Sequence, residues 1–170
     1  MRTSICPGSF DPVTLGHLDI IERAANLFDH VYVAVLDNPE KEPLFSVDER
    51  VELLQLVVEG ESLENVTVEG FRGLSVNYAR DKGAIAIVRG LRAVTDFEWE
   101  LKLSAMNRNL APEIETVFMM TSAEYSFISS SAVKEVASLG GNVSRWVCRT
   151  VERRLQDKFG RKVGEQRESN

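Results

Sequence analysis

CPGSFDPVTLGH, residues 6–17, joins the first predicted strand of this chain to its first predicted helix. Gly8 has no side chain to hold a ligand away and can adopt backbone angles that other residues avoid. Pro12 biases the residue before it towards an extended conformation, which stiffens the turn. Gly16 falls in the first helical turn, where unpaired N–H groups and the helix dipole attract anions. With an imidazole from His17 beside them, these features predict a nucleotide phosphate site.

The chain beyond this stretch continues as a helix and then a strand. Leu18, Ile21, Ala25 and Phe28 follow one another at i, i+3, i+7 and i+10, which makes one apolar stripe. Val31–Leu36 is a continuous apolar run, typical of a strand buried on both faces of a parallel sheet. Strand, helix and strand in so short a span predict a βαβ unit with a right-handed crossover.

The same alternation of strands and helices runs through the rest of the chain. Strands are expected at Thr3–Cys6, Val31–Leu36, Val66–Val68, Ala84–Val88 and Glu115–Thr121. Helices are expected at Leu15–Phe28, from Val47, at Leu74–Lys82, from Thr95 to about Leu110, at Ser130–Leu139 and at about Ser144–Phe159. Strands that alternate with helices predict an α/β fold with a parallel sheet.

Three of the expected helices begin with capping residues. Thr14 is the expected N-cap of the first helix, which makes His17 its third residue. Ser46 and Glu49 form a capping box, in which each side chain accepts a hydrogen bond from the backbone of the other residue. Thr95 and Glu98 have the same spacing and predict a second capping box.

The helix from Thr95 carries apolar residues on two nearly opposite faces. The two sets are Phe97, Leu101 and Ala105 on one face, and Trp99, Leu103, Met106 and Leu110 on the other. One set can cover the sheet, and the other needs a second partner. That partner is either a neighbouring helix of the same chain or another subunit, because a large exposed apolar patch is unusual on a monomer.

Composition indicates one globular domain. The chain has 170 residues, and we expect a single domain over residues 1–159 with a polar, disordered tail at 160–170. A net charge of −6 argues against nonspecific binding of nucleic acid, which needs a basic surface. Two distant cysteines suggest neither a zinc site nor a disulfide framework and fit a reducing cytoplasm. No apolar run is long enough for a signal peptide or a membrane span.

Polar residues gather where the predicted strands end, which is where parallel α/β sheets bind ligands. Arg89 and Arg92 follow the fourth strand. Their position at a strand end favours a pair of guanidinium groups that bind phosphate oxygens over a pair of solvated surface arginines. Lys41, in the loop after the second strand, lies between two glutamates and taken alone suggests solvated surface. The serines at 126 and 129–131 precede a helix, and they can both cap it and line an anion site. No Ser-His-Asp set, zinc motif, Walker loop or Gly-x-Gly-x-x-Gly motif is present.

Several of these motifs together carry a family resemblance. Thr14–His17 resembles the T/H-x-G-H signature of the nucleotidylyltransferase superfamily. The segments 6–12, 89–92, 96–98 and 125–131 are similar to those of the bacterial phosphopantetheine adenylyltransferases, and the similarity extends to about residue 139. The chain departs from that family at Ser9, where many members have Thr, and at Cys6, where Tyr is common.

The resemblance implies a fold, a reaction and an assembly. The fold is a Rossmann-like, doubly wound parallel sheet of five strands with helices on both faces. The reaction transfers AMP from ATP to 4′-phosphopantetheine and gives dephospho-coenzyme A and pyrophosphate, with Mg²⁺ held through the ATP phosphates and not by protein side chains. The family also implies a homohexamer, and it makes coenzyme A a candidate feedback inhibitor. From composition we expect a cytoplasmic protein that binds no nucleic acid or membrane.

The resemblance also implies which residues form the site. The catalytic positions are His17, which would stabilise the transition state, together with Lys41 and Arg89. The ATP-binding positions are Ser9, Phe10, His17, Gly90, Leu91, Arg92, Glu100, Tyr125, Ser126, Phe127, Ile128, Ser129, Ser130 and Ser131. The phosphopantetheine-binding positions are Ser9, Lys41, Ser75 and Arg89.

Three alternatives remain at this point. The first is a related adenylyltransferase that uses another phosphorylated acceptor, such as nicotinamide mononucleotide. The second is a nucleotide-binding regulator without catalysis, against which stand His17, Lys41, Arg89 and Arg92, because such a protein would be expected to lose some of them. The third is a structural interaction module, which is favoured only by the second apolar face of the Thr95 helix.

Overall fold

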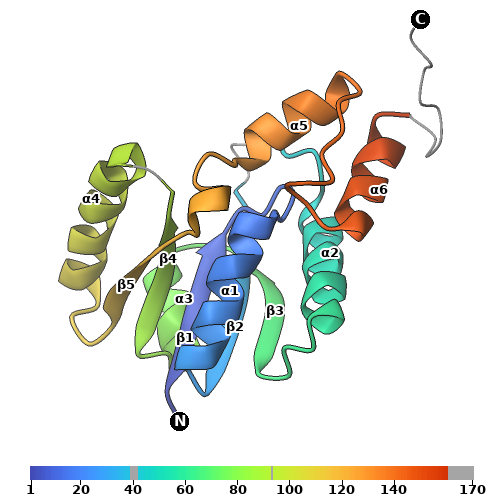
Figure 1. The fold of residues 1–170 in the computed structure, drawn as a ribbon. Helices are drawn as coiled ribbons and strands as arrows, with labels where there is room; N and C mark the ends of the chain where they lie inside the picture. The colour runs from blue at the N-terminus through green and yellow to red at the C-terminus, as the bar shows by residue number, and fades with distance from the viewer. Residues whose placement is uncertain (39–41, 93, 161–170) are drawn as a thin grey trace, which may run out of the picture.

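The computed structural model describes residues 1–38, 42–92 and 94–160, and the side chains of residues 94 and 95 are outside that description. The elements are β1 (Thr3–Gly8), α1 (Leu15–Leu27), β2 (His30–Leu36), α2 (Val47–Gly60), β3 (Val66–Phe71), α3 (Ser75–Asp81), β4 (Ala86–Leu91), α4 (Val94–Leu110), β5 (Glu115–Met120), the 3₁₀ helix η1 (Ala123–Tyr125), α5 (Ser130–Ser138) and α6 (Arg149–Lys158) (Figure 1). Within the described ranges, no helix is long and apolar enough to cross a membrane.

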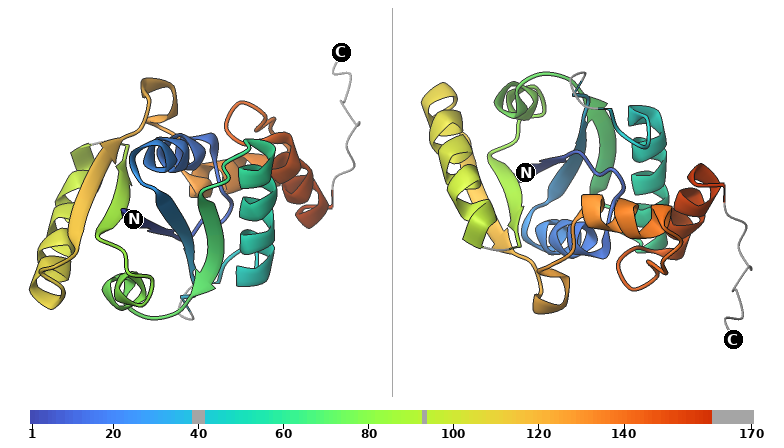
Figure 2. Two further views of the ribbon diagram at one scale, coloured as in Figure 1. Left: turned by 90° about the horizontal axis from the view of Figure 1, so that it is seen from below. Right: turned by 90° about the horizontal axis from the view of Figure 1, so that it is seen from above.

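The five strands form one parallel sheet in the order β3-β2-β1-β4-β5. The chain first builds outward from β1 to β3, then crosses back to β4 and builds outward in the other direction. Right-handed crossovers therefore place α1 and α2 on one face of the sheet and α3 and α4 on the other (Figure 2). This arrangement confirms the predicted Rossmann-like, doubly wound fold with helices on both faces.

Side chains alternate between the two faces along each strand, and each face has its own apolar core. Cys6 and Val88 belong to the larger core, which also contains residues of α1, α2, α5 and α6. Their neighbours Ile5 and Ile87 belong to the smaller core beneath α3. Buried strands of this kind need apolar residues at successive positions, which explains the continuous run in β2.

Several strand boundaries differ from those expected. β1 and β3 continue past the expected ends at Cys6 and Val68 because each stays in register with β2 to its last residue. The expected strand Ala84–Val88 begins two residues later and ends at Leu91. Its polar residue Arg89 pairs with Phe118 of β5, so Arg89, which was expected to follow the strand, belongs to it.

Two helix starts also correct the prediction. α4 begins at Val94, so Thr95 lies inside the helix and is not its N-cap. Asp96 instead accepts hydrogen bonds from the backbone N–H and the Nε of Arg92, at 3.3 and 3.1 Å. α6 begins at Arg149 and not near Ser144. The Ser46 capping box is confirmed, with 3.2 Å from Glu49 N to Ser46 Oγ and 2.8 Å from Ser46 N to Glu49 Oε2.

The middle of the sheet opens towards the carboxyl ends of its strands. β1 pairs with β2 along its whole length, from Thr3 to Gly8. It pairs with β4 only at Ser4 and Ile5, opposite Ala86 and Ile87. Beyond that point β1 and β4 diverge, so a crevice forms where the winding direction of the sheet reverses, which is the usual ligand site of such folds.

Candidate functional site

A cleft of about 540 Å³ lies over the carboxyl edge of the sheet at this divergence. Its walls come from the β1–α1 loop, the start of α1, the end of β4, the first turns of α4 and the start of α5, which crosses this edge (Figure 1). The predicted site residues that line it are Ser9, Phe10, His17, Arg89, Gly90, Arg92, Glu100, Ile128, Ser129, Ser130 and Ser131.

Other predicted residues lie outside the lining of this cleft. Ser75 begins α3, and Leu91 is buried in the sheet with 5% of its surface exposed. Tyr125, Ser126 and Phe127 precede the cleft-lining serines without reaching the cleft themselves, and Phe127 is 93% exposed. Lys41 lies outside the described residues, as does nearly all of the expected tail at 160–170.

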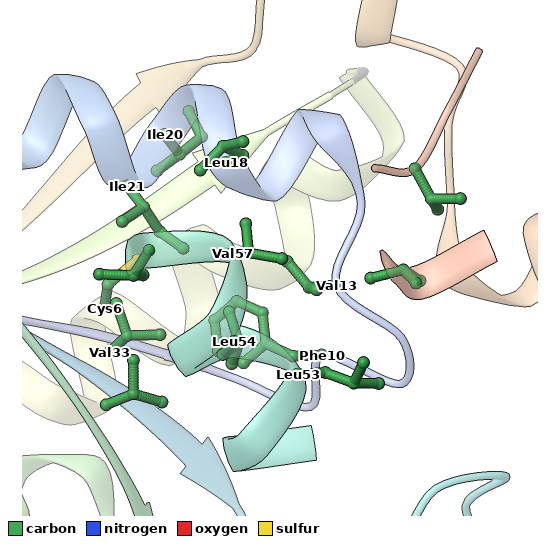
Figure 3. Close-up of a cluster of buried hydrophobic side chains, with 14 of the residues drawn as sticks. Cys6, Phe10, Val13, Leu18, Ile20, Ile21, Val33, Leu53, Leu54 and Val57 are labelled. Atoms are coloured by element: carbon green, nitrogen blue, oxygen red, sulfur yellow. The ribbon is translucent and has the colours of Figure 1, made fainter. Parts of the chain in front are cut away.

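The β1–α1 loop is anchored by apolar side chains that point into the core. Phe10 and Val13 are 4% and 2% exposed and lie close to Leu53, Leu54 and Val57 of α2 (Figure 3). This anchoring fixes the backbone of the loop, so its polar atoms keep one position beside the cleft.

Gly8 serves this anchoring and not an unusual backbone angle. The positive φ of the loop is at Phe10, at 48°, while Gly8 lies in β1. A Cβ on Gly8 would come within 3.0 Å of the Phe10 ring. The conformational freedom of Gly8 is therefore not used here, and its missing side chain makes room for Phe10.

The imidazole of His17 is locked in one tautomer. The backbone N–H of Thr14 donates to Nδ1 at 3.1 Å, and the Thr14 hydroxyl accepts from the backbone N–H of His17 at 3.3 Å. These two bonds form a capping box in which the residue at the third position is a histidine. Because a backbone N–H can only donate, Nδ1 accepts, and the proton of the neutral ring resides on Nε2. Nε2 has no hydrogen-bond partner among the described residues, so it can donate to a ligand.

The side chain of His17, at the start of α1, is partly buried. The ring packs edge-on against Phe10, with 5.0 Å between the ring centroids. Burial first, and then the positive charges of Arg92 and Arg89, lower the pKa of His17 from 6.5 to about 4. The imidazole of the free protein is therefore a neutral N–H donor at physiological pH.

The first turn of α1 offers fewer free N–H groups than expected. The N–H of Leu15 donates to the carbonyl of Trp146 at 2.8 Å, and that of His17 is bonded to Thr14. In the described part of the chain, Gly16 retains an unpartnered N–H, and it lines the cleft. The helix start therefore contributes one amide and its dipole to an anion site.

Arg89 bridges the gap where β1 and β4 part. Its Nη1 donates to the carbonyl of Pro7 in β1 at 2.7 Å, and its Nε donates to Glu100 of α4 at 2.8 Å. A second bond from Nη2 makes the pairing with Glu100 bidentate, and Glu100 is 8% exposed. Two N–H groups of the guanidinium remain for a ligand, and the two-point contact with Glu100 fixes their direction.

Arg92 connects the start of α4 with the segment that precedes α5. Its Nε donates to Asp96 at 3.1 Å and its Nη1 to the carbonyl of Ile128 at 3.0 Å. Ser129 caps α5 by accepting from the N–H of Ala132 at 3.1 Å. The serine run is therefore both a helix cap and part of the cleft wall, as both interpretations allowed.

Two basic residues of the cleft, Lys134 and Arg50, were not identified from the sequence. Lys134 of α5 donates to Asp11 at 2.6 Å, and the same carboxylate accepts from the N–H groups of Leu44 and Phe45. These three donors outweigh the effect of burial and lower the pKa of Asp11. Asp11 and Lys134 are 123 positions apart in the sequence, so no spacing could have paired them.

Arg50 of α2 is the other missed residue, and it is 3% exposed. Its side chain lines the cleft and donates to main-chain carbonyls, including that of Ser9 at 2.7 Å. One signal was available in the sequence: Arg50 falls between Val47 and Leu54 on the apolar stripe of its helix, where a charged residue is unexpected.

Cys6, one of the departures from the family pattern, lines the floor of the cleft. Burial raises the pKa of its thiol to about 11, although the charge of Arg89 opposes that effect. Cys6 is therefore a neutral thiol at physiological pH, and it packs as an apolar residue.

Comparisons with known proteins agree with this geometry. The cytidylyltransferase-like family matches residues 5–136. The phosphopantetheine adenylyltransferase of Desulforudis audaxviator is 57% identical over 94% of this chain and 97% of its own length. That of Heliobacterium modesticaldum is 54% identical over 94% of both chains.

Solved structures with low sequence identity share the fold. The nicotinic acid mononucleotide adenylyltransferase of Plasmodium falciparum, complexed with NaAD, superposes with a TM-score of 0.70 at 12% identity and covers 94% of this chain and 96% of its own. A nicotinate-nucleotide adenylyltransferase described as putative, from Vibrio parahaemolyticus, gives a TM-score of 0.67 at 17% identity, covering 95% and 97%.

The tautomer and the pKa of His17 can be measured directly. Because the chain has two histidines, a His30→Gln variant leaves one imidazole signal for nitrogen NMR. We expect the Nε2–H tautomer at pH 7 and a titration near pH 4. An Nδ1–H tautomer, or a titration at or above pH 6.5, would contradict the geometry.

The same shift predicts how His17 contributes to stability. Between pH 6.5 and about 4 the unfolded chain protonates this imidazole and the folded protein does not. The His17 contribution to the free energy of unfolding therefore falls as the pH decreases through this window. Urea unfolding of the wild type and of His17→Gln should show a difference that shrinks towards low pH, and a difference that grows would contradict the sign.

Proposed function

The chain belongs to the phosphopantetheine adenylyltransferases of the cytidylyltransferase-like family, and from this membership we propose that it transfers AMP from ATP to 4′-phosphopantetheine. The products are dephospho-coenzyme A and pyrophosphate, in the penultimate step of coenzyme A biosynthesis. The observation that carries this function is the neutral His17, which faces the same cleft as the guanidinium groups of Arg89 and Arg92.

The reaction depends more on the alignment of the two substrates than on a general base. The acceptor phosphate already has a nucleophilic oxygen, so no strong general base is needed. The oxygen attacks the α-phosphorus of ATP, the bond to the β-phosphate oxygen breaks, and pyrophosphate leaves. The protein must bring two anions together and stabilise the charge that builds at the phosphorus.

The proposed nucleotide half of the site is the wall formed by α1, Arg92 and the start of α5. The Nε2–H of His17 would donate to the transferring phosphate, beside the free N–H of Gly16. Arg92 and the hydroxyls of 129–131 would hold the leaving pyrophosphate. Because Asp96 and the carbonyl of Ile128 already fix Arg92, little side-chain entropy is lost when ATP binds.

The proposed acceptor half is the opposite wall of the cleft. Arg89, oriented by Glu100, and Ser9, whose side chain is exposed, would bind the phosphate of 4′-phosphopantetheine. From the family resemblance we propose that Lys41 orients the attacking phosphate together with Arg89, and that Ser75 helps to hold phosphopantetheine. With the two halves meeting at Ser9, the attacking oxygen would lie near His17, which lines the same cleft.

We propose Mg²⁺ as a cofactor that enters with the nucleotide. In the ranges that the structure describes, no group of three or more His, Cys, Asp or Glu residues is arranged to hold a metal ion. Three of the carboxylates that line the cleft form ion pairs, namely Glu100 with Arg89, Asp96 with Arg92 and Asp11 with Lys134, and the fourth, Glu42, is exposed. This set of side chains fits an ion bound through the ATP phosphates, whose charge it would partly neutralise.

We further propose a homohexamer in which α4 lies at a subunit interface. Trp99, Met106 and Leu110 are 64%, 60% and 50% exposed, so the described part of the chain does not cover this apolar face. A patch of this kind on an isolated subunit favours association. The described residues therefore do not supply the neighbouring helix that the alternative explanation of this face requires.

Two smaller proposals follow from the same activity. Coenzyme A shares the pantetheine arm and the pyrophosphate link of the product, so it would compete for this cleft as a feedback inhibitor. Cys6 and Cys148 are free thiols, which fits work in the reducing cytoplasm.

A pyrophosphate-release assay tests the proposed function. With ATP and Mg²⁺, we expect release that depends on 4′-phosphopantetheine, because its phosphate would supply the attacking oxygen. Nicotinamide mononucleotide and pantetheine serve as control acceptors. Equal release with nicotinamide mononucleotide, or none with phosphopantetheine, would overturn the assignment.

His17→Ala tests the proposed electrostatic role. Loss of a hydrogen bond made to the transferring phosphate should lower kcat by on the order of 100-fold or more. The ATP concentration at half-maximal rate should change much less. His30→Ala is the matched control, because that imidazole bonds to Thr67 away from the cleft. Near-normal turnover of the folded His17→Ala protein would refute the role.

Sedimentation tests the hexamer. The wild type should sediment as six copies, and Met106→Lys combined with Leu110→Lys should reduce the assembly, since two charges would enter the apolar face. Leu139→Lys, at an exposed position beyond α5, is the control. A wild type that is monomeric at micromolar concentration would contradict the proposal.

A further inference from the structure

Arg50 is a buried cation without a carboxylate partner. The other described arginines and lysine of the cleft each pair with an acid, namely Arg89 with Glu100, Arg92 with Asp96 and Lys134 with Asp11. Arg50 is 3% exposed and forms no such pair within the described residues. It is also the fourth residue of α2, at the end of the first turn, where the helix dipole disfavours a positive charge. An uncompensated charge in this position is costly, so its presence calls for an explanation.

Main-chain carbonyls fix the guanidinium without neutralising it. Nε donates to Phe45 and Ser46 at 3.0 and 3.3 Å, within its own helix start. Nη1 donates to Ser9, just after β1, at 2.7 Å and to Leu36, the last residue of β2, at 3.2 Å. Arg50 therefore joins the carboxyl ends of two neighbouring strands and holds the loop that carries Ser9.

The third nitrogen of the guanidinium is left for a ligand. Nη2 has no hydrogen-bond partner among the described residues, although the side chain is almost wholly buried and lines the cleft. Buried donors are nearly always bonded in folded proteins. A charged donor that is already fixed in direction, beside the exposed Ser9, has the properties of a phosphate ligand.

We propose that Arg50 binds the phosphate of the acceptor through Nη2, in addition to its contacts with the backbone. The acceptor is favoured over ATP because Arg50 bonds to the ends of β1 and β2, whereas Arg92 and α5 form the other wall. Arg50 also holds the start of α2, which follows the loop that contains Lys41. This inference rests on the proposed function for the identity of its ligand.

Comparison of 4′-phosphopantetheine with pantetheine isolates the phosphate contact. Calorimetry gives the ratio of the two dissociation constants for the wild type, Arg50→Met and Arg50→Lys. We expect both variants to lose about tenfold or more of the preference for the phosphorylated ligand. Lysine keeps the charge, but the carbonyls of Ser9, Leu36 and Phe45 would occupy its ammonium and leave no donor for the phosphate.

The control is Arg154→Met. Arg154 also contacts α2, through Glu52, but it does not line the cleft, so its loss should leave the ratio unchanged. ATP affinity, measured in parallel, should change by less than about threefold in the Arg50 variants. A folded Arg50→Lys protein with the wild-type ratio would overturn the inference and leave Arg50 with its backbone contacts alone.

A crystal structure of the wild type with 4′-phosphopantetheine decides the question if neither variant folds. Nη2 within hydrogen-bond distance of a phosphate oxygen supports the inference, and a phosphate bound away from Arg50 overturns it. Failure of the proposed function is a separate result. A wild type that binds phosphopantetheine and releases no pyrophosphate contradicts the reaction and leaves the Arg50 contact standing.

Discussion

The structure depends on the parting of β1 from β4. These two strands pair at Ser4 and Ile5 and then diverge, and the gap is bridged by a side chain, the guanidinium of Arg89. If the backbone hydrogen bonds between β1 and β4 continued as far as Gly8, they would close the crevice. Because the sheet changes its direction of winding here, two loops and the starts of two helices, α1 and α5, converge on one small volume.

The second constraint is that the described hydrogen-bond donors around this cleft are held in place before any ligand binds. Glu100 and Asp96 orient Arg89 and Arg92, the backbone of Thr14 fixes the tautomer of His17, and carbonyls hold Arg50. These bonds leave particular N–H groups directed at the cleft. Preorganised donors of this kind stabilise charge that develops during a reaction without having to move, which is the main need of phosphoryl transfer.

The sequence predicted those parts that local pattern controls. The apolar run of Val31–Leu36 indicated the parallel sheet, and residues 6–17 marked the site because their small and rigid residues are informative one by one. The length of β4 depends on its partner β5, so the sequence placed Arg89 after the end of the strand and not within it. The pairing of Asp11 with Lys134 joins distant segments. Arg50 was hidden because helical periodicity locates apolar faces and does not say why a charge interrupts one.

The central claim is that AMP transfer takes place where β1 and β4 diverge. Its most direct test is a crystal structure of the protein with the reaction product, dephospho-coenzyme A. We expect the pyrophosphate link of the product to lie within about 3 Å of His17 Nε2, with its pantetheine side towards Arg89. A product bound outside this cleft, or with its phosphates away from His17, would contradict the account.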